Sequence, residues 1–333
     1  MTSTPTSTES APAGPAGKKD ASSSSAGAPP VRRRRSLWKR VYRERGAYVF
    51  ILPGLVFILL FAYVPMLGNI VAFQDYSPYL GIAGSEFVGM ENFKAIFRDP
   101  EVINALVNTL IISALQIVFA FPAPILLALF LNSLLSDRTK RTIQTIVYLP
   151  HFISWVVVIS IWQKILGGAG LVSQIFERIG LESVNIMANP ETFKILVTAQ
   201  VIWKDVGWGT IIFFAAIASI PTELYEAAAA DGAGSWRRMW HITLPGMLPV
   251  ISILLILTVG NTLSVGFEQL LLQQPAVGAA AAQVLDTFVY FRGIAGGDWG
   301  ISTAAGLLKG VIATILVLGA NWLAKRMGGE GVI

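Results

Sequence analysis

Six long apolar stretches, separated by shorter polar segments, dominate the hydrophobic pattern of the chain. They run near residues 47–73, 106–133, 143–166, 193–220, 247–272 and 302–324. Each is long enough to cross a bilayer as a helix, which takes about 20 residues. The stretches are continuously apolar rather than alternating, which disfavours the strands of a membrane β-barrel. The pattern therefore predicts an all-α integral membrane protein with six transmembrane helices.

The polar ends of the chain frame this membrane domain. Residues 1–36 are rich in Ser, Thr, Ala, Pro and Gly, and they end in a basic run without periodic apolar positions. Such a segment buries too little apolar surface to offset its ordering entropy, so we expect a disordered basic tail. The transmembrane domain spans 37–327, and a short tail follows at 328–333.

Basic residues are distributed unevenly among the polar segments. Cations concentrate at 31–46, 134–142, 221–246 and after residue 324, whereas the alternate loops carry fewer. The positive-inside rule then places both termini in the cytoplasm, which an even number of spans also requires. Because the cations flank apolar spans, they indicate placement beside membrane lipid rather than binding of nucleic acid.

The composition limits the chemistry that the chain can carry. Charged residues make up 14% of the chain, against about a quarter in a typical soluble domain. There is no cysteine, and His151 and His241 are the two histidines, which leaves too few ligands for a thiolate or multi-histidine metal centre. No catalytic set of nucleophile, base and acid can be placed. We therefore expect neither a cofactor nor an enzymatic activity.

One polar segment, 221–245, combines strong helix formers with helix breakers. Pro221 suits the first position of a helix, and the Glu-Leu-Tyr-Glu-Ala run that follows has high helix propensity. Gly232 can end that helix in a left-handed conformation, and Ser235 is a suitable N-cap for a second helix. The segment therefore predicts a helix, a break and a second helix.

This segment resembles the EAA motif of binding-protein-dependent ABC importer permeases, whose pattern is roughly E-A-A-x-x-D-G-A followed by I-x-L-P. The matching residues are Glu226, Ala227, Ala228, Asp231, Gly232, Ala233, Ile242, Leu244 and Pro245. Similarity to the complex-saccharide branch of that family extends to 48–54, 148–152, 284–290 and 304–307. The resemblance as a whole covers roughly residues 45–327.

The resemblance implies the type I ABC importer permease architecture, in which this segment forms a cytoplasmic coupling helix seated in a groove of an ATPase. It implies that Glu226 makes a charged contact to the ATPase and that Gly232 permits the bend. The chain would be a permease subunit in a bacterial cytoplasmic membrane, translocating a sugar or oligosaccharide. Its partners would be an ABC ATPase dimer, a second, non-identical permease subunit and an extracytoplasmic solute-binding protein. Because the chain has no G-x-x-x-x-G-K-[ST] sequence, ATP hydrolysis is expected on a separate chain.

Polar side chains inside the predicted spans are the candidates for a substrate path, because charges in a bilayer are costly and usually face a cavity or a partner. The candidates are Trp203, Lys204, Asp205, Asn261, Glu268 and Gln269. For Lys204 and Asp205, an ion pair that is satisfied inside the bundle is the alternative, and Glu268 also lies close enough to an outer end to reach water. We expect His151 to be satisfied within the bundle and Lys309 to lie at a close helix contact between small residues.

Two other functions stay open from the sequence. A permease of the same kind would serve equally for another solute, such as a peptide or a polyol. A stand-alone channel or secondary carrier would need no ATPase, and segment 221–245 would then be a simple connector between two spans.

Overall fold

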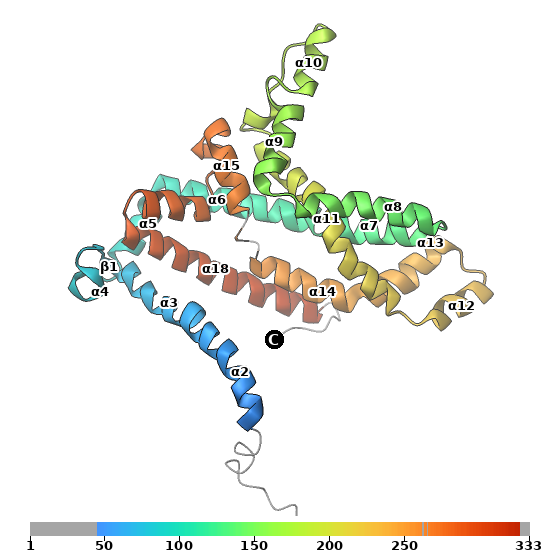
Figure 1. Cartoon of the computed structure of the whole chain (residues 1–333), viewed down its shortest axis with the longest axis horizontal. Coiled ribbons are helices and arrows are strands. Elements are labelled where there is room, and N and C mark those ends of the chain that lie inside the picture. The colour runs from blue at the N-terminus through green and yellow to red at the C-terminus, as the bar shows by residue number, and fades with distance from the viewer. Residues whose placement is uncertain (1–44, 262, 265, 327–333) are drawn as a thin grey trace, which may run out of the picture. The chain divides into compact units, whose positions relative to one another are not determined.

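The computed structural model (Figure 1) describes residues 45–261, 263–264 and 266–326, so the expected tails at 1–36 and 328–333 lie outside the described residues. Within those ranges six helical segments are long and apolar enough to cross a membrane, as the hydrophobic pattern predicts. They are Tyr48–Phe73, Pro100–Ser133, Trp155–Arg178, Phe193–Ala218, Ser235–Asn261 and Trp299–Arg326.

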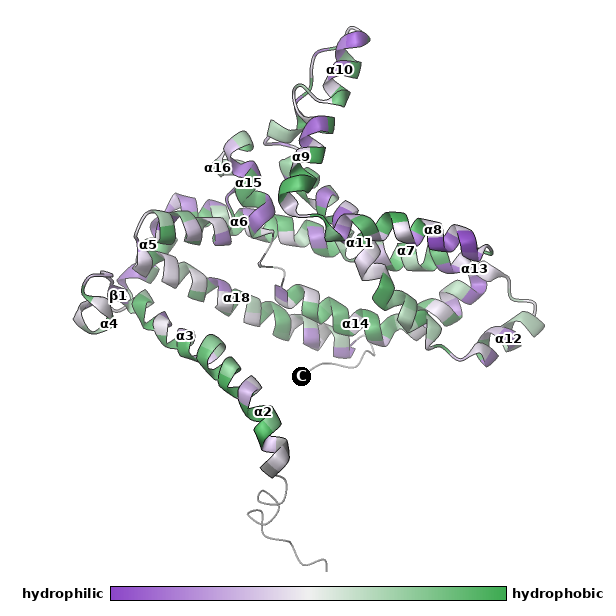
Figure 2. Ribbon diagram, in the orientation of Figure 1, coloured by the Kyte–Doolittle hydropathy of each residue, from purple (hydrophilic) through white to green (hydrophobic). Residues whose placement is uncertain are grey.

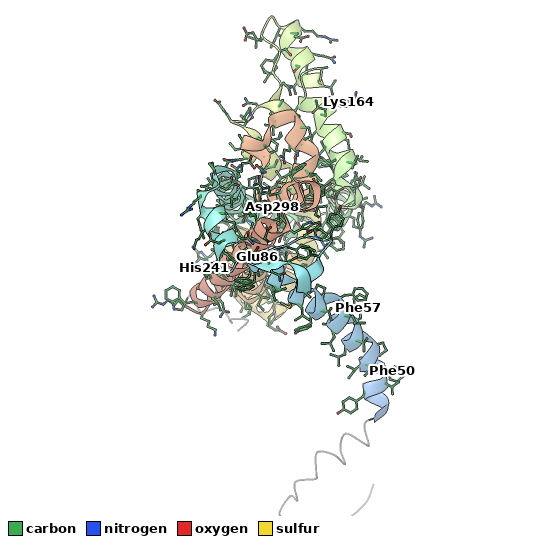
Figure 3. The ribbon with its side chains drawn as sticks, turned by 90° about the vertical axis from the view of Figure 1, so that its left-hand side faces the viewer. Phe50, Phe57, Glu86, Lys164, His241 and Asp298 are labelled. Atoms are coloured by element: carbon green, nitrogen blue, oxygen red, sulfur yellow. The ribbon has the colours of Figure 1, made fainter. Side chains whose placement is uncertain are left out.

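The first span is divided between the two compact units of the chain, Met1–Phe61 and Ala62–Ile333. In the described part of the first unit, helix α2 (Arg45–Ile58) exposes most of its apolar side chains, including Phe50 and Phe57 (Figure 3). A helix that is apolar all round suits lipid or another apolar protein surface. In the second unit the span continues through α3 (Val64–Met66) and the 3₁₀ segment η2 (Leu67–Phe73).

The second and fourth spans lie side by side in the second unit (Figure 1). The second consists of α6 (Pro100–Leu115), the π turn η3 (Gln116–Ala120) and α7 (Pro122–Ser133). Proline lacks a backbone donor, so the wider turn before Pro122 accommodates the interrupted hydrogen bonds. The fourth span is the single helix α11 (Phe193–Ala218), which packs along α7.

The fifth and sixth spans form a second adjacent pair, α14 (Leu244–Asn261) beside α18 (Trp299–Arg326), and Figure 2 shows that α14 is almost uniformly apolar. The start of α18 packs against η2, α5 (Glu91–Arg98) and α17 (Leu285–Val289). Ala304 and Ala305 are fully buried there, since small residues let helices approach closely. A short hairpin of β1 (Gln74–Asp75) and β2 (Glu86–Phe87), joined through α4 (Gly81–Gly84), adjoins this end.

The third span differs from the predicted continuous stretch 143–166. The structure has α8 (Asp137–Tyr148), a 3₁₀ turn η4 (Leu149–Phe152) and α9 (Trp155–Leu166), followed by α10 (Leu171–Arg178). Pro150 lies inside η4, where its missing donor and ring prevent a continuous helix. The prediction of one unbroken helix here was wrong, because hydropathy does not register a break in an apolar sequence.

The fifth span also differs from the predicted stretch 247–272. It begins earlier, at Ser235, and it ends earlier, because α14 ends at Asn261. Gly266 adopts a left-handed conformation with φ of 44°, and it starts the separate helix α15 (Phe267–Val277), which α16 (Ala279–Ala282) follows. A left-handed residue cannot continue a right-handed helix, and glycine tolerates it best. Residues 267–272 therefore belong to a different element from the fifth span.

Candidate functional site

Segment 221–245 forms an elbow between the fourth and fifth spans. Helix α12 (Thr222–Ala230) ends where Gly232 takes a φ of 75°. The N–H of Gly232 donates to the Ala229 carbonyl at 3.0 Å, and that of Ala233 donates to the Ala228 carbonyl at 2.8 Å. This pair of bonds is the Schellman motif, which satisfies the last carbonyls of a helix around a left-handed residue.

A second helix follows the break, as the sequence predicts. It begins with α13 (Ser235–Arg238) and runs through the π turn η6 (Met239–Thr243) directly into α14. The boundaries differ slightly from the prediction. Pro221 is the N-cap of α12 rather than its first residue, and Gly234, not Ser235, is the N-cap of α13.

The nine motif residues of the elbow fall into two groups. The exposed group comprises Glu226, Ala227, Asp231, Gly232 and Pro245. The half-buried group comprises Ala228, Ala233, Ile242 and Leu244. Ile242 and Leu244 pack against an apolar cluster of the spans that includes Phe213 and Met247. The motif therefore combines an exposed surface on and after α12, which lies at one end of the second unit (Figure 1), with anchors that fix the elbow to the bundle.

A small cavity of about 370 Å³ adjoins this surface. It lies between the end of α11 and the start of α14, and Leu224 and Ile242 contribute apolar side chains to its walls. Figure 2 shows polar residues gathered nearby on α8 and α13. A partner protein that contacts the elbow would meet an acidic helix, basic side chains and an apolar recess within a short distance.

The break in the third span is held by Lys204 of α11. The side chain is 8% exposed. Its ammonium group donates hydrogen bonds to the carbonyl oxygens of Pro150, His151 and Ile153, at 3.3, 2.7 and 2.6 Å. A proline-broken turn leaves carbonyls without helical partners, and in a bilayer these must be satisfied within the protein. Lys204 therefore caps the break, and it does not pair with Asp205.

Asp205, the next residue, has its own partner at the same break. Its carboxylate accepts a hydrogen bond from Nδ1 of His151 at 2.8 Å, and the two side chains are 42% and 31% exposed. The imidazole stacks on Trp208 with ring centroids 4.5 Å apart and 3° between the planes, and Phe152 meets both rings edge-on. We call His151, Phe152, Asp205 and Trp208 the aromatic platform.

The aromatic platform lies near the middle of the fourth span, since Asp205 and Trp208 are central in Phe193–Ala218. An ionisable pair exposed at that depth is costly in lipid, so it faces a water-filled path or another protein chain. From the sequence we expect His151 to be satisfied within the bundle, and Trp208 either to stack on a sugar or to anchor at the membrane interface. The stacking of these two rings on each other was not predicted. The signal was present in a histidine beside a helix-breaking proline and in a tryptophan three residues after an intramembrane aspartate.

The remaining substrate-path candidates do not join the aromatic platform. Trp203 is partly exposed and meets Trp162 of α9 edge-on at 6.2 Å between ring centroids. Asn261 ends α14 and Glu268 is exposed in the first turn of α15. The structure therefore brings Lys204 and Asp205 to one place. It puts Trp203 of the same helix against α9, and it leaves Asn261 and Glu268 on other elements.

Gln269 is buried in a network of amides that joins α15 to α11. Its Nε2 donates to Oε1 of Gln200 at 2.7 Å and to the Val197 carbonyl at 3.0 Å. Gln273 donates to the same Gln200 oxygen at 3.0 Å, and Gln200 Nε2 donates back to Gln273 Oε1 at 3.1 Å. Because the three side chains satisfy one another, we assign Gln269 to holding α15 in place.

Lys309 also has a partner that the sequence did not indicate. Its ammonium group lies 2.5 Å from Oδ1 of Asp286, and this ion pair joins α17 to α18. The neighbouring Gly306 and Gly310 do not lie at a close helix contact, because a Cβ at either position would have no neighbour within 4 Å among the described residues. Among the described residues, no other helix therefore packs closely against these two glycines of α18.

These features define a class of protein: a six-span, all-helical membrane permease whose fourth and fifth spans are joined by an exposed helical elbow. Residues 120–329 match the family described as the inner membrane component of binding-protein-dependent transport systems. The chain belongs to this family, as the resemblance of its elbow to the EAA motif implies.

Individual relatives support the same assignment. The polygalacturonan/rhamnogalacturonan transport system permease protein YteP of Bacillus subtilis is 45% identical over 90% of this chain and 94% of its own length. The protein LplB of the same organism is 44% identical over 87% of this chain and 92% of its own. A chain of the bacterial alginate ABC transporter, solved in complex with an alginate pentasaccharide-bound periplasmic protein, has a TM-score of 0.82 and 38% identity, covering 90% of this chain and all of that one.

Proposed function

We propose that the chain is one membrane-spanning subunit of an ATP-driven importer that moves an oligosaccharide across a bacterial cytoplasmic membrane. The observation that carries the proposal is the elbow, an exposed helix fixed to the spans at its base, with the motif residues of a coupling loop on its surface. The basic residues around the elbow and near both ends of the chain support a cytoplasmic position for all three.

The proposal assigns ATP hydrolysis to a separate ABC ATPase dimer, since the chain has no phosphate-binding loop sequence. The similarity to an alginate transporter solved with a periplasmic protein supports a solute-binding protein as a further partner. The exposed apolar faces of the spans suit contact with lipid and with a second, non-identical permease subunit. No part of this assembly requires the chain itself to be an enzyme.

The aromatic platform supports an oligosaccharide as the solute. The exposed faces of Trp208 and Phe152 offer apolar surfaces on which the C–H faces of a sugar ring can lie, and Asp205 and His151 offer polar atoms for hydroxyl groups. YteP and the alginate transporter are both named for polysaccharides, and alginate is described as acidic. We place the path of the saccharide along the aromatic platform.

Removal of the charge at Glu226 will separate the chain from its ATPase. In Glu226→Ala, we expect ATPase co-purification and coupled transport to fall by about tenfold or more, because a hydrogen bond to a charged group contributes about 1.5–3 kcal/mol. Gly232→Pro will act similarly, since proline cannot adopt the φ of 75° at this position. Glu182→Ala, which removes an exposed carboxylate distant in sequence from the elbow, is the control. If both elbow variants kept ATPase association and transport, the coupling role would be excluded.

Removal of the Trp208 ring will slow saccharide transport. In proteoliposomes that contain the complete transporter, we expect Trp208→Ala to lower uptake of oligogalacturonides or alginate oligosaccharides by about tenfold. Trp322→Ala removes a comparably exposed ring from the end of α18 and will leave uptake near wild type. If Trp208→Ala and Trp322→Ala took up the saccharide at equal rates, the aromatic platform would not be part of the path. Uptake by the purified chain without an ATPase would instead favour a stand-alone carrier.

A further inference from the structure

Helix α12 is attached to the rest of the chain through very few side chains. All of its residues, Thr222–Ala230, are described, and all except Tyr225 and Ala228 are exposed. Tyr225 and Ala228 are three positions apart and so lie on one face of the helix. The Tyr225 ring packs against the apolar cluster of the spans that includes Phe213 and Met247. An otherwise exposed helix is therefore held mainly by one aromatic side chain.

The Tyr225 ring also ends in a specific polar contact. Its hydroxyl group shares a hydrogen bond of 3.0 Å with Oγ1 of Thr243, a residue that is 2% exposed. Thr243 is the last residue of the π turn η6, so the bond connects α12 to the point where the elbow becomes the fifth span. A hydroxyl buried in such a place needs a partner, which makes this one orientation of α12 favourable over others.

The spans around this bond are already fixed to one another. Met247, one turn beyond Thr243, is fully buried against Phe213 of α11 and Leu129 of α7. Gly246 lies so close to Ile220 that a Cβ there would come within 2.7 Å of the isoleucine Cδ1. The base of the elbow is thus buried in the bundle, while α12 is bounded by the Pro221 junction and the Gly232 break. A change in the angle of α12 requires a change at Tyr225.

We propose that Tyr225 and Thr243 are positioning residues that fix the angle between α12 and the spans, and so determine how much of the movement of an ATPase reaches the transport path. The inference rests on the proposed function of the elbow and deepens it. With the hydrogen bond intact, α12 and the inner ends of the second, fourth and fifth spans move together. Without it, α12 remains docked on the ATPase but swings against the bundle, and hydrolysis continues with less transport.

The test uses the assembled transporter in lipid nanodiscs with the variants Tyr225→Phe, Thr243→Val and the pair combined. Both changes keep the shape of the side chain and remove a hydroxyl group. The first readout is the ratio of ATPase activity with binding protein and oligogalacturonide to the activity without them. We expect each single change to lower this ratio about fivefold through higher basal hydrolysis, with no further loss in the double variant, because one bond is removed in all three.

The second readout is the orientation of α12 itself. The chain has no cysteine, so cysteines introduced at the exposed positions Ala229 on α12 and Leu257 on α14 can carry spin labels without background. We expect a narrow distribution of distances between the labels in the wild type and a broader one in all three variants. Tyr63→Phe and Thr314→Val remove hydroxyl groups from exposed positions outside the elbow and are the matched controls.

The possible results separate the inference from the function on which it rests. A wild-type chain that does not bind an ATPase contradicts the proposed function. A wild-type chain that does bind one, with Tyr225→Phe keeping the wild-type activity ratio and label distances, overturns the positioning role alone. Additive losses in the double variant also overturn it, because they would show that Tyr225 and Thr243 act separately.

Discussion

Replacing Lys204 with methionine is expected to destabilise the transmembrane domain by about 3 kcal/mol. The substitution keeps the length of the side chain but removes the donor of three hydrogen bonds to the broken turn at Pro150. Hydrogen bonds from a charged group contribute about 1.5–3 kcal/mol each. Part of that contribution is offset, because methionine also removes the cost of burying an ammonium group. The net effect is a loss, since methionine fills the buried space of Lys204 and leaves its carbonyl partners without that donor.

Unfolding of the detergent-solubilised chain by urea or heat, followed by tryptophan fluorescence, measures this loss. Lys164→Met is the matched control, because Lys164 lies exposed on α9 (Figure 3) and the same change there removes no contact with the turn. If the two variants unfolded alike, Lys204 would not be the cap of the break.

Substitution of Gly207 by alanine is expected to have an effect of similar size, again about 3 kcal/mol. A Cβ at this position would lie 2.1 Å from the Val147 carbonyl oxygen and 2.9 Å from Cδ1 of Tyr148. A flexible side chain could move aside, but the nearest atoms belong to the backbone of α8, so two helices have to separate. The same unfolding measurements test the prediction, together with a loss of assembled transporter.

Gly306→Ala provides the contrast within the membrane. A Cβ there would have no neighbour within 4 Å among the described residues, and alanine favours a helix over glycine by about 1 kcal/mol. We therefore expect this variant to be as stable as the wild type or more stable. If Gly306→Ala lost as much stability as Gly207→Ala, the loss in Gly207→Ala could not be assigned to the contact between α11 and α8.

The six spans and the elbow could be predicted because their signals are local. Continuous apolar runs mark the spans, and the break at Gly232 follows from the conformational freedom of glycine next to strong helix formers. The motif residues were found for the same reason, but their division into exposed and anchoring residues was not. Ile242 and Leu244 differ from Ala227 in what the spans place against them, and a motif does not contain that information.

The candidate site at the break in the third span could be predicted only in part, because its geometry depends on contacts between distant segments. The sequence drew attention to Lys204 and Asp205 as costly charges, yet their partners lie more than 50 positions away at the third-span break. The break itself was hidden in an apolar run. Lys309 illustrates the same difficulty, since the two glycines beside it suggested a helix contact while its partner, Asp286, lies on another element.

The amide network of Gln200, Gln269 and Gln273 gives the contact between α15 and α11 an unusual property. None of these side chains gains or loses a proton near neutral pH, and none carries a net charge for salt to screen. The network joins α15 to the half of α11 that is remote from the elbow. An ion pair at the same place would weaken at high salt or at low pH. The strength of the contact between α15 and α11 therefore does not depend on pH near neutrality or on the salt concentration at that end of the molecule.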